Sequence, residues 1–246
     1  MMPAMWRWRV WLGFLVAAGL VGPVAAAPPL VMVVDTSAVM PEARIEGGHV
    51  REGLHADLGA ALARRLGRPV QMQALPRKRI AQALQSGEAD LVCDYQSAWL
   101  PGPFRWSRAF IPDQTVLLTA AALPAPQGLA GVAGEPVGTV LGYAYPEVAE
   151  ALGGGFVRDD APDAVANLHK LELARVPHVL TGRRLLDYQR RIGGFTLALH
   201  PPLVVAEVLG QCGLSARSEV TLAALNTAIN GIVADGELNR ILGKYR

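Results

Sequence analysis

Short apolar runs alternate with stretches of helical period along this chain, and this alternation constrains the fold more than any other feature of the sequence. β-branched runs predict strands, whereas apolar residues three and four positions apart predict helices. In the first half we expect three strands, at 29–35, 69–75 and 89–95, and two helices between them, at 53–67 and 77–87. Such alternation is typical of βαβ units with a largely parallel sheet.

The same alternation returns in the second half. We expect three further strands and three further helices there, with the strands at 135–143, 156–160 and 177–182 and the helices at 144–154, 161–176 and 185–194. Two extended segments, 109–131 and 195–215, flank this round, and a helical tail with Ser218 as its N-cap follows at 218–246. The pattern therefore predicts two lobes around a cleft, with the tail returning to the first lobe.

The first residues have the layout of an export signal. A basic start, "MWRWR", precedes the apolar run "VWLGFLVAAGLVG" and the small residues "VAAA". Val24 and Ala26 suit the −3 and −1 positions, which predicts removal of residues 1–26 and a mature chain that begins at Ala27 in the periplasm. A membrane anchor is the alternative, but the run is shorter than the roughly 20 residues that a span needs. Because no cysteine lies near the cut, we do not expect a lipoprotein anchor.

The charge of the mature chain is balanced. The signal segment carries Arg7 and Arg9 and no acidic residue, so the 23 basic residues of the whole chain fall to 21, equal to the 21 acidic ones. A nucleic-acid partner is therefore not expected, because such proteins carry a basic surface.

Two cysteines and five histidines bear on redox and metal chemistry. An even cysteine count in an oxidising compartment favours a disulfide between Cys93 and Cys212, with two buried free thiols as the alternative. The histidines show no paired metal-ligand spacing, so we expect them on the surface or in the core and expect no metal and no cofactor. They are His49, His55, His169, His178 and His200.

Five segments in the same order resemble the periplasmic solute-binding proteins of family 3, best known for amino-acid capture by ABC transporters. They are "GLHADLGAALARRLG", "PRKRIAQALQSGEADL", "RWSRAFIPDQTVLLT", "GEPVGTVLGYAYPEV" and "LNTAINGIVADGELNRILGKY". The resemblance spans nearly the whole mature chain. It implies an α/β fold of two Rossmann-like lobes joined by two hinge strands, the type II or Venus-flytrap arrangement, with the ligand closed in the cleft.

The resemblance also implies lobe boundaries and a cysteine pairing. Lobe 1 is expected to hold residues 27–113 and 207–246, and lobe 2 residues 114–206. In the resembled family the strand that returns from the second lobe lies beside the third strand of the first. That arrangement would make Cys93 and Cys212 neighbours, within the roughly 4.4–6.8 Å between Cα atoms that a disulfide needs.

The chain departs from the resembled family at both ends of the usual ligand clamp. Family members that bind α-amino acids usually carry an arginine that holds the ligand carboxylate, and Pro101, Gly102 and Pro103 stand in that region here. The position of the second-lobe aspartate that takes the ammonium group is Gly182. We therefore expect standard α-amino acids to bind weakly, and a small anionic or aromatic solute to bind instead.

Candidate ligand-binding residues of the first lobe follow the strand at 89–95. Strands of open α/β sheets carry ligands just past their carboxyl ends. Asp94, Tyr95, Gln96 and Ser97 offer hydrogen bonds there, and Trp99 offers a flat face for stacking. For Trp99, an aromatic side chain packed under a loop is the alternative.

Candidates from the second lobe should face this stretch. Gly142, Tyr143 and Ala144 lie where a strand gives way to a helix, so their N–H groups could cradle an anion. Thr181 lies near the end of the last strand of the lobe. Arginines that could replace the missing clamp are Arg79 and Arg183, with a solvated surface position as the alternative for each.

Two functions fit these features. A binding protein that captures a solute for an ABC-type transporter or a receptor is the favoured one. The alternative is an enzyme on the same scaffold, since some relatives resemble periplasmic cyclohexadienyl dehydratases. That chemistry needs an acid in the cleft, for which Glu42 and Asp94 are the candidates. The sequence contains no hydrolase elbow, zinc-protease motif or phosphate-binding loop.

Overall fold

The structure is a computed structural model that describes residue 1 and residues 28–245. The predicted export signal, residues 1–26, lies outside this range except for its first residue, so its cleavage stays a prediction. Within the described part, no helix has the length and apolar character to cross a membrane.

The first half of the chain forms a parallel sheet in the order β4-β1-β5. Its strands are β1 (Leu30–Asp35), β4 (Val70–Leu75) and β5 (Leu91–Tyr95). The helices between them are α1 (Leu54–Leu66) and α2 (Arg77–Ser86). Both helices end at a glycine in the left-handed conformation, Gly67 with φ 65° and Gly87 with φ 80°. The predicted order of strands and helices in this half is confirmed.

A hairpin interrupts this order between β1 and α1. Its strands are β2 (Arg44–Glu46) and β3 (His49–Glu52), and the turn is Gly47-Gly48 with φ 58° and 79°. Two consecutive residues with positive φ give the turn whose twist suits a two-residue hairpin, and glycine adopts that conformation without steric cost.

The second half repeats the pattern, with parallel strands in the order β10-β8-β9. The strands are β8 (Pro136–Val140), β9 (Val157–Ala161) and β10 (His178–Gly182). The helices are α3 (Pro146–Leu152), α4 (Ala164–Glu172) and α5 (Arg183–Arg191), with short 3-10 turns at η2 (Leu129–Val132) and η3 (Gly153–Gly155). Helix α5 begins two residues before the predicted start at 185, because the Asp113 carboxylate, from a distant strand, accepts a hydrogen bond from the Arg184 N–H at 3.0 Å.

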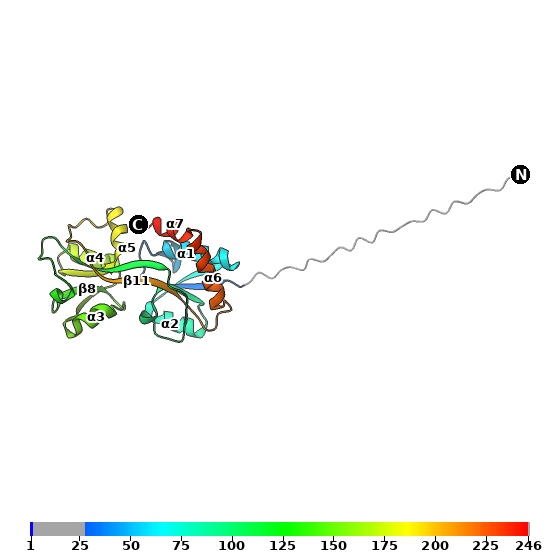
Figure 1. Cartoon of the computed structure of the whole chain (residues 1–246), viewed down its shortest axis with the longest axis horizontal. Helices are drawn as coiled ribbons and strands as arrows, with labels where there is room; N and C mark the ends of the chain where they lie inside the picture. The colour runs from blue at the N-terminus through cyan, green and yellow to red at the C-terminus, as the bar shows by residue number, and fades with distance from the viewer. Residues whose placement is uncertain (2–27, 246) are drawn as a thin grey trace.

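Two long antiparallel strands, β7 (Ile111–Thr119) and β11 (Leu203–Leu214), join the halves, as Figure 1 shows. Among the described residues they complete one nine-stranded sheet, in which β11 also pairs with β5 and with the short β6 (Arg105–Trp106). The expected lobe boundaries fall inside this pair, where Gln114 lies opposite Glu207. Those boundaries stay a prediction.

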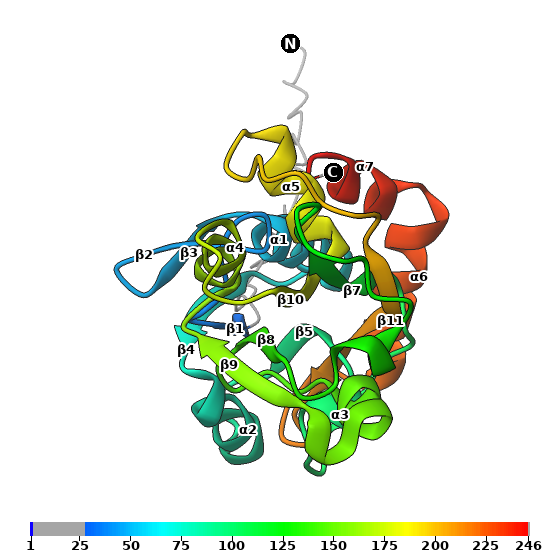
Figure 2. The ribbon, with the colours of Figure 1, turned by 90° about the vertical axis from the view of Figure 1, so that its left-hand side faces the viewer.

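Helices cover both faces of each half of the sheet. Figure 2 shows α2 and α3 on one side and α1, α4, α5, α6 and α7 on the other. Successive residues of β1 therefore pack in two different hydrophobic cores, one on each face of the sheet. Met32 packs with Leu58 of α1, whereas Val33 packs with Ile80 of α2. Such burial of both faces explains why the strands read as continuous apolar runs.

Cys93 of β5 and Cys212 of β11 form a disulfide inside the first half. They lie directly opposite each other in the antiparallel pair, with their Cα atoms 4.0 Å apart and both side chains fully buried. The predicted disulfide is confirmed, although the Cα separation is slightly shorter than the usual range.

The C-terminal tail packs on α1 as two helices, α6 (Leu222–Ala234) and α7 (Glu237–Gly243). Gly236, with φ 74°, separates them. The N-cap of α6 is Thr221, whose hydroxyl accepts a hydrogen bond from the Ala224 N–H, so the prediction of Ser218 as the cap is wrong. Ser218 lies one turn too early to reach the free N–H groups of the helix.

Candidate functional site

A cavity opens between the two halves, where the carboxyl ends of several strands meet the strands that join the halves. Asp35 ends β1, Asp94 lies near the end of β5, and Thr181 lies near the end of β10; all three line it. Further walls come from the loop after β1, from β7, from the loop after β8 and from the first turns of α1, α2 and α5. This is the position at which open α/β sheets bind ligands.

The structure brings together part of the predicted site. The predicted residues that line the cavity are Glu42, Asp94, Tyr95, Trp99, Tyr143, Ala144 and Thr181. Those that do not line it are Arg79, Gln96, Ser97, Gly142 and Arg183. Gln96 and Ser97 face away because the chain turns into a short 3-10 helix, η1 (Ser97–Trp99), which returns Trp99 to the cavity.

The predicted residue Arg79 does not line the cavity, and Arg77, the first residue of α2, lines it instead. Residues two apart on a helix do not share a face. Arg79 therefore points outward and pairs with Glu88 at 3.4 Å, with half of its side chain exposed. Arg77 points inward, where its Nη1 lies 3.2 Å from both the Asp35 carboxylate and the Tyr95 hydroxyl.

The predicted residue Arg183 likewise does not line the cavity, whereas its neighbour Arg184 does. Arg183 is partly exposed and pairs with Asp187 one turn later on α5, at 3.1 Å. Arg184 points into the cavity, and only 5% of its side chain is exposed. The sequence prediction was one residue out, because it placed the start of α5 too late.

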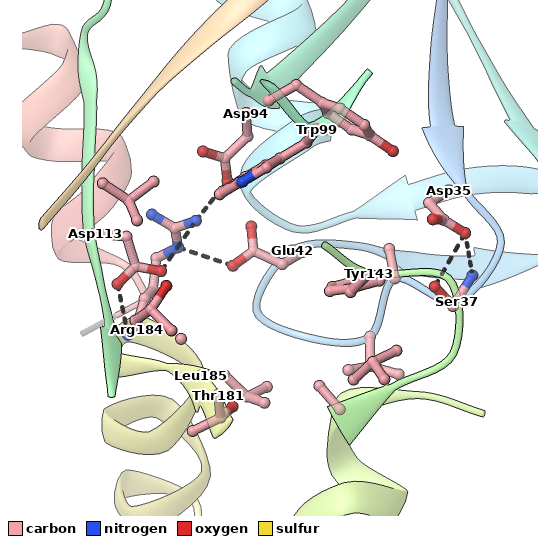
Figure 3. Close-up of a pocket in the computed structure, with 18 of the residues that line it drawn as sticks. Asp35, Ser37, Glu42, Asp94, Trp99, Asp113, Tyr143, Thr181, Arg184 and Leu185 are labelled. Atoms are coloured by element: carbon pink, nitrogen blue, oxygen red, sulfur yellow. Dashed lines mark hydrogen bonds and ion pairs between the residues drawn. The ribbon is translucent and has the colours of Figure 1, made fainter. Parts of the chain in front are cut away.

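Three carboxylates converge on the Arg184 guanidinium, as Figure 3 shows. Its Nε donates to Glu42 Oε1 at 2.8 Å, and its Nη2 donates to Asp94 Oδ2 at 2.5 Å. The Asp113 carboxylate lies 3.7 Å from the same Nη2. Arg184 belongs to the second half, Glu42 and Asp94 belong to the first, and Asp113 belongs to β7. One side chain therefore ties both halves and a joining strand together.

Asp94 is held in an unusual backbone conformation. Its φ is 61°, in the left-handed region that costs a residue with a side chain roughly 1–3 kcal/mol. Gly210 of β11 makes room for it, since a Cβ there would lie 2.4 Å from Asp94 Oδ1 and 3.1 Å from Asp94 Cα. This conformation directs the carboxylate toward Arg184 instead of along the strand.

Asp113 places a carboxylate beside Gly182, the position that matches the second-lobe aspartate of the resembled family. A Cβ on Gly182 would lie 2.9 Å from Asp113 Oδ2. The missing aspartate therefore does not leave the region without an acid, because β7 supplies one. Sequence alignment along β10 could not reveal a carboxylate that comes from another strand.

Burial and mutual repulsion raise the pKa of two carboxyl groups in this cluster, those of Glu42 and Asp113. Burial raises the pKa of Glu42 to about 7, with Arg184 opposing the shift and with Asp94 and Asp113 adding to it. Burial also raises the pKa of Asp113. It lowers the pKa of His55, which lines the cavity next to them, so that this imidazole is neutral at neutral pH.

A second charged group lies on the other side of the cavity. The Arg77 guanidinium stacks on Tyr143, 4.3 Å from the ring centroid, and on Tyr95 at 5.0 Å. Its ion-pair partner Asp35 also accepts hydrogen bonds from the backbone and hydroxyl of Ser37. Both arginines that line the cavity are thus already paired with carboxylates.

Several buried polar atoms of the cavity have no hydrogen-bond partner. Six buried side-chain atoms are unpartnered among the described residues, and four of them belong to residues that line this cavity. These four are Glu42 Oε2, His55 Nδ1, Trp99 Nε1 and Thr181 Oγ1. Each unpartnered buried atom costs about 1–3 kcal/mol, so a ligand that pairs with them would be stabilised by doing so.

Three of these side chains also have metal-ligand chemistry. Ligand atoms of Glu42, His55 and Asp94 lie within 4.8 Å of one another, a cluster that the spacing of histidines in the sequence did not indicate. The Arg184 guanidinium contacts both carboxylates of the cluster, so a metal ion bound there would lie next to a fixed positive charge.

Six polar or charged residues that line the cavity were not predicted from the sequence. They are Asp35, Ser37, His55, Arg77, Asp113 and Arg184. Asp35 and Ser37 follow the end of a predicted strand, the same signal that identified Asp94. Asp113 lies within a strand that joins the halves, and His55 lies in the first turn of a helix. Neither of those positions carries a local signal for ligand binding.

Comparison with known proteins gives one family and a set of similar folds. The family model described as bacterial extracellular solute-binding proteins, family 3, matches residues 30–246. A search of curated protein sequences found no match.

Among solved structures, an ancestral arginine-binding protein bound to arginine has 20% sequence identity and a TM-score of 0.71, covering 88% of this chain and 97% of its own. The GluR0 ligand-binding core in complex with L-glutamate has 15% identity and a TM-score of 0.73, covering 90% and 99%. The VFT2 domain of BvgS from Bordetella pertussis has 18% identity and a TM-score of 0.72, covering 88% and 93%. At these identities the likeness concerns the fold.

Proposed function

Because this chain belongs to the bacterial extracellular solute-binding proteins of family 3, we propose that it captures a small solute in the cavity between its lobes and delivers it to an inner-membrane ABC permease or presents it to a sensor. The two-lobed fold with its joining strands β7 and β11 supports a mechanism of hinge closure. A solute that contacts both lobes shifts the balance from open to closed forms.

One observation carries this proposal. Four of the six buried side-chain atoms without a partner among the described residues gather in the cavity between the halves. Scattered unpartnered atoms would indicate only imperfect packing, whereas their convergence at the carboxyl ends of the strands indicates a site built for polar groups of a ligand.

The solute class follows from the charges. The relatives were solved with arginine, with glutamine and with L-glutamate. Here Arg77 and Arg184 are both ion-paired, so we propose that standard α-amino acids bind weakly. The aromatic solute expected from the sequence is supported by Trp99 and Tyr143 in the cavity wall. The anionic solute is not, because four carboxylates line the same cavity.

We also propose that the chain is exported, cleaved before Ala27 and active as a monomer in the periplasm. The family description supports an extracellular or periplasmic location. N-terminal sequencing of the exported protein tests the cleavage, and an intact 1–26 segment would exclude it.

An enzyme remains the second candidate because of Glu42. Burial raises its pKa to about 7, which gives it both the protonated and the ionised form at neutral pH, as a general acid or base requires. Mass spectrometry of cyclohexadienyl acids incubated with the protein tests this. A product formed by wild type and not by Glu42→Gln would favour the enzyme, and unchanged substrate would favour the binding protein.

The direct test of solute capture is native mass spectrometry of the protein purified from its own periplasm. We expect an extra mass of a small molecule that disappears on denaturation. The same measurement on Thr181→Val, which removes one unpartnered hydroxyl, should show reduced occupancy. The matched control Thr227→Val changes an exposed hydroxyl on α6 and should leave occupancy unchanged. A protein that carries no molecule and binds none of a broad solute panel would contradict the proposal.

A further inference from the structure

Negative charge exceeds positive charge in the cavity. The described residues that line it include four carboxylates and two arginines. Asp35 is balanced by Arg77, but Glu42, Asp94 and Asp113 share the single guanidinium of Arg184. Buried carboxylates without a matching cation are unfavourable, and the raised pKa of Glu42 reflects this. Glu42, Asp94 and Asp113, here called the acidic cluster, can therefore accept one further cation without an excess of positive charge.

Two hydrogen-bond acceptors are available beside that cluster. Glu42 Oε2 and His55 Nδ1 are buried, and neither has a partner in the described part of the chain. Ligand atoms of the two residues lie within 4.8 Å of each other. A neutral imidazole can present Nδ1 as an acceptor, so one N–H-bearing cation between the two side chains could donate to both.

The walls favour an organic cation over a metal ion. Trp99 and Tyr143 line the cavity, and aromatic faces attract ammonium and guanidinium groups. The acidic cluster already accepts N–H donors from one guanidinium, that of Arg184, in good geometry. A metal ion coordinated by Glu42, His55 and Asp94 would instead place a concentrated positive charge next to the fixed guanidinium of Arg184.

The opposite side of the cavity offers little to a carboxylate. Arg77 is stacked between Tyr95 and Tyr143 and paired with Asp35, and its side chain is only 17% exposed. A ligand carboxylate placed there would compete with Asp35 for one guanidinium. The carboxylate of an α-amino acid is therefore expected to weaken binding in this cavity.

We propose that the solute is a small amine or guanidine without a carboxylate, whose cation is held by Glu42 and His55 beside the Asp94–Arg184–Asp113 cluster. This proposal rests on the proposed function as a solute-binding protein. It specifies which solutes the cavity selects, and it assigns Glu42 as the residue that selects for positive charge.

The affinity should depend on pH through Glu42. The charged or titratable groups near it in the described part of the chain are Arg184 from α5, Asp94 from β5, Asp113 from β7, His55 from α1 and Tyr143 from the loop after β8. A cation binds the ionised form of Glu42, whose pKa in the free protein is raised to about 7. Binding below that pH must displace a proton, so amine affinity should rise from pH 5.5 to pH 8 and then level off.

The test compares amines with their parent amino acids by calorimetry at pH 8, in buffer with a chelator, on mature protein from which retained solute has been removed. The pairs are agmatine with arginine, cadaverine with lysine, histamine with histidine, and tyramine with tyrosine. We expect at least one amine to bind ~10-fold or more tightly than its parent, a difference of about 1.4 kcal/mol.

Variants test which residues are responsible for amine binding. Glu42→Gln should weaken amine binding by ~30-fold or more and remove its pH dependence, because the buried carboxylate is replaced by a neutral group of the same shape. Asp113→Asn should weaken it as well, and it keeps an acceptor for the Arg184 N–H that caps α5. The matched control is Glu46→Gln on the exposed hairpin, which should bind as wild type does.

Several outcomes would overturn the inference. They are parent amino acids that bind as tightly as the amines, no binding by any of the four amines at 1 mM, or wild-type affinity in Glu42→Gln. Zn²⁺ binding without chelator that is tighter than any amine and lost in Glu42→Gln would assign the cluster to a metal ion instead. In each case native mass spectrometry still decides solute capture separately, because a retained acid or neutral molecule would support capture and exclude amine selection.

Discussion

At the scale of single residues, the site depends on side chains whose positions are set by residues far along the chain. Asp94, Tyr95 and Trp99 could be predicted because they lie at a strand end or just after it, and all three line the cavity. For the arginines, the sequence predicted Arg79 and Arg183, whereas Arg77 and Arg184 line the cavity. Which side chain of a helix faces the cavity depends on where the helix begins, and Asp113 sets that start for α5 from another strand.

Gly210 gives the sharpest prediction at this scale. A Cβ there would clash with Asp94 Oδ1 at 2.4 Å, so Gly210→Ala should displace the Asp94 carboxylate from Arg184. We expect a loss of ~1–3 kcal/mol in the free energy of unfolding, measured by urea denaturation. Gly128→Ala is the matched control, since a Cβ there meets nothing within 4 Å. Equal stability of the two variants would show that the structure around Asp94 relaxes freely.

At the scale of elements, the alternation of strands and helices was predictable because both faces of each half are buried. The hairpin β2–β3, the break between α6 and α7 and the start of α5 were not. Each of these depends on a single position, such as the left-handed Gly236, or on a contact from a distant segment. Local periodicity contains no information about such contacts.

Arg184 connects α5 with β5, β7 and the loop of Glu42, so its loss should separate elements as well as destabilise them. Arg184→Gln would leave three carboxylates without their shared cation, which should cost ~3–5 kcal/mol in the free energy of unfolding. X-ray scattering should show a larger radius of gyration. Arg183→Gln, which removes a partly exposed pair, is the control and should change stability by about 1 kcal/mol or less.

The disulfide links β5 to β11 within the first half. Replacing Cys93 and Cys212 together by serine should lower the free energy of unfolding by ~2–5 kcal/mol, because the closed loop is long and the unfolded chain gains freedom. Solute affinity should change little, because both cysteines are fully buried in the core of the first half and only Cys93 borders the cavity. A double variant as stable as wild type would contradict this.

At the scale of the whole molecule, the two-lobed architecture could be predicted from the twofold repetition of the strand–helix pattern and from the family resemblance. The chemistry of the cleft could not, because its acids and arginines come from β1, the loop after β1, α2, β5, β7 and α5. The resemblance indicated that the usual clamp residues are absent from their positions, and this stays a prediction. It could not indicate that Asp113 and Arg184 bring the same kinds of charge from elsewhere.

The expectation for standard amino acids belongs to this scale, since it concerns the whole cleft. Both cavity arginines are paired, so a ligand carboxylate lacks a partner, a loss of ~3–5 kcal/mol and a factor of at least about a hundred in affinity. Calorimetry at neutral pH should give dissociation constants no tighter than about 100 μM for all of them. Micromolar binding of any standard amino acid would refute this.

The position of the disulfide has a topological consequence. The chain leaves the first half after Cys93 and returns to it before Cys212, and β8, β9 and β10 all lie between the two sulfur atoms. The excursion is therefore a covalent ring. A protease that nicks any loop of that ring produces two polypeptides that still migrate as one molecule until a reductant is added. The second half of the protein is thus tethered at both ends, and a single backbone break cannot detach it.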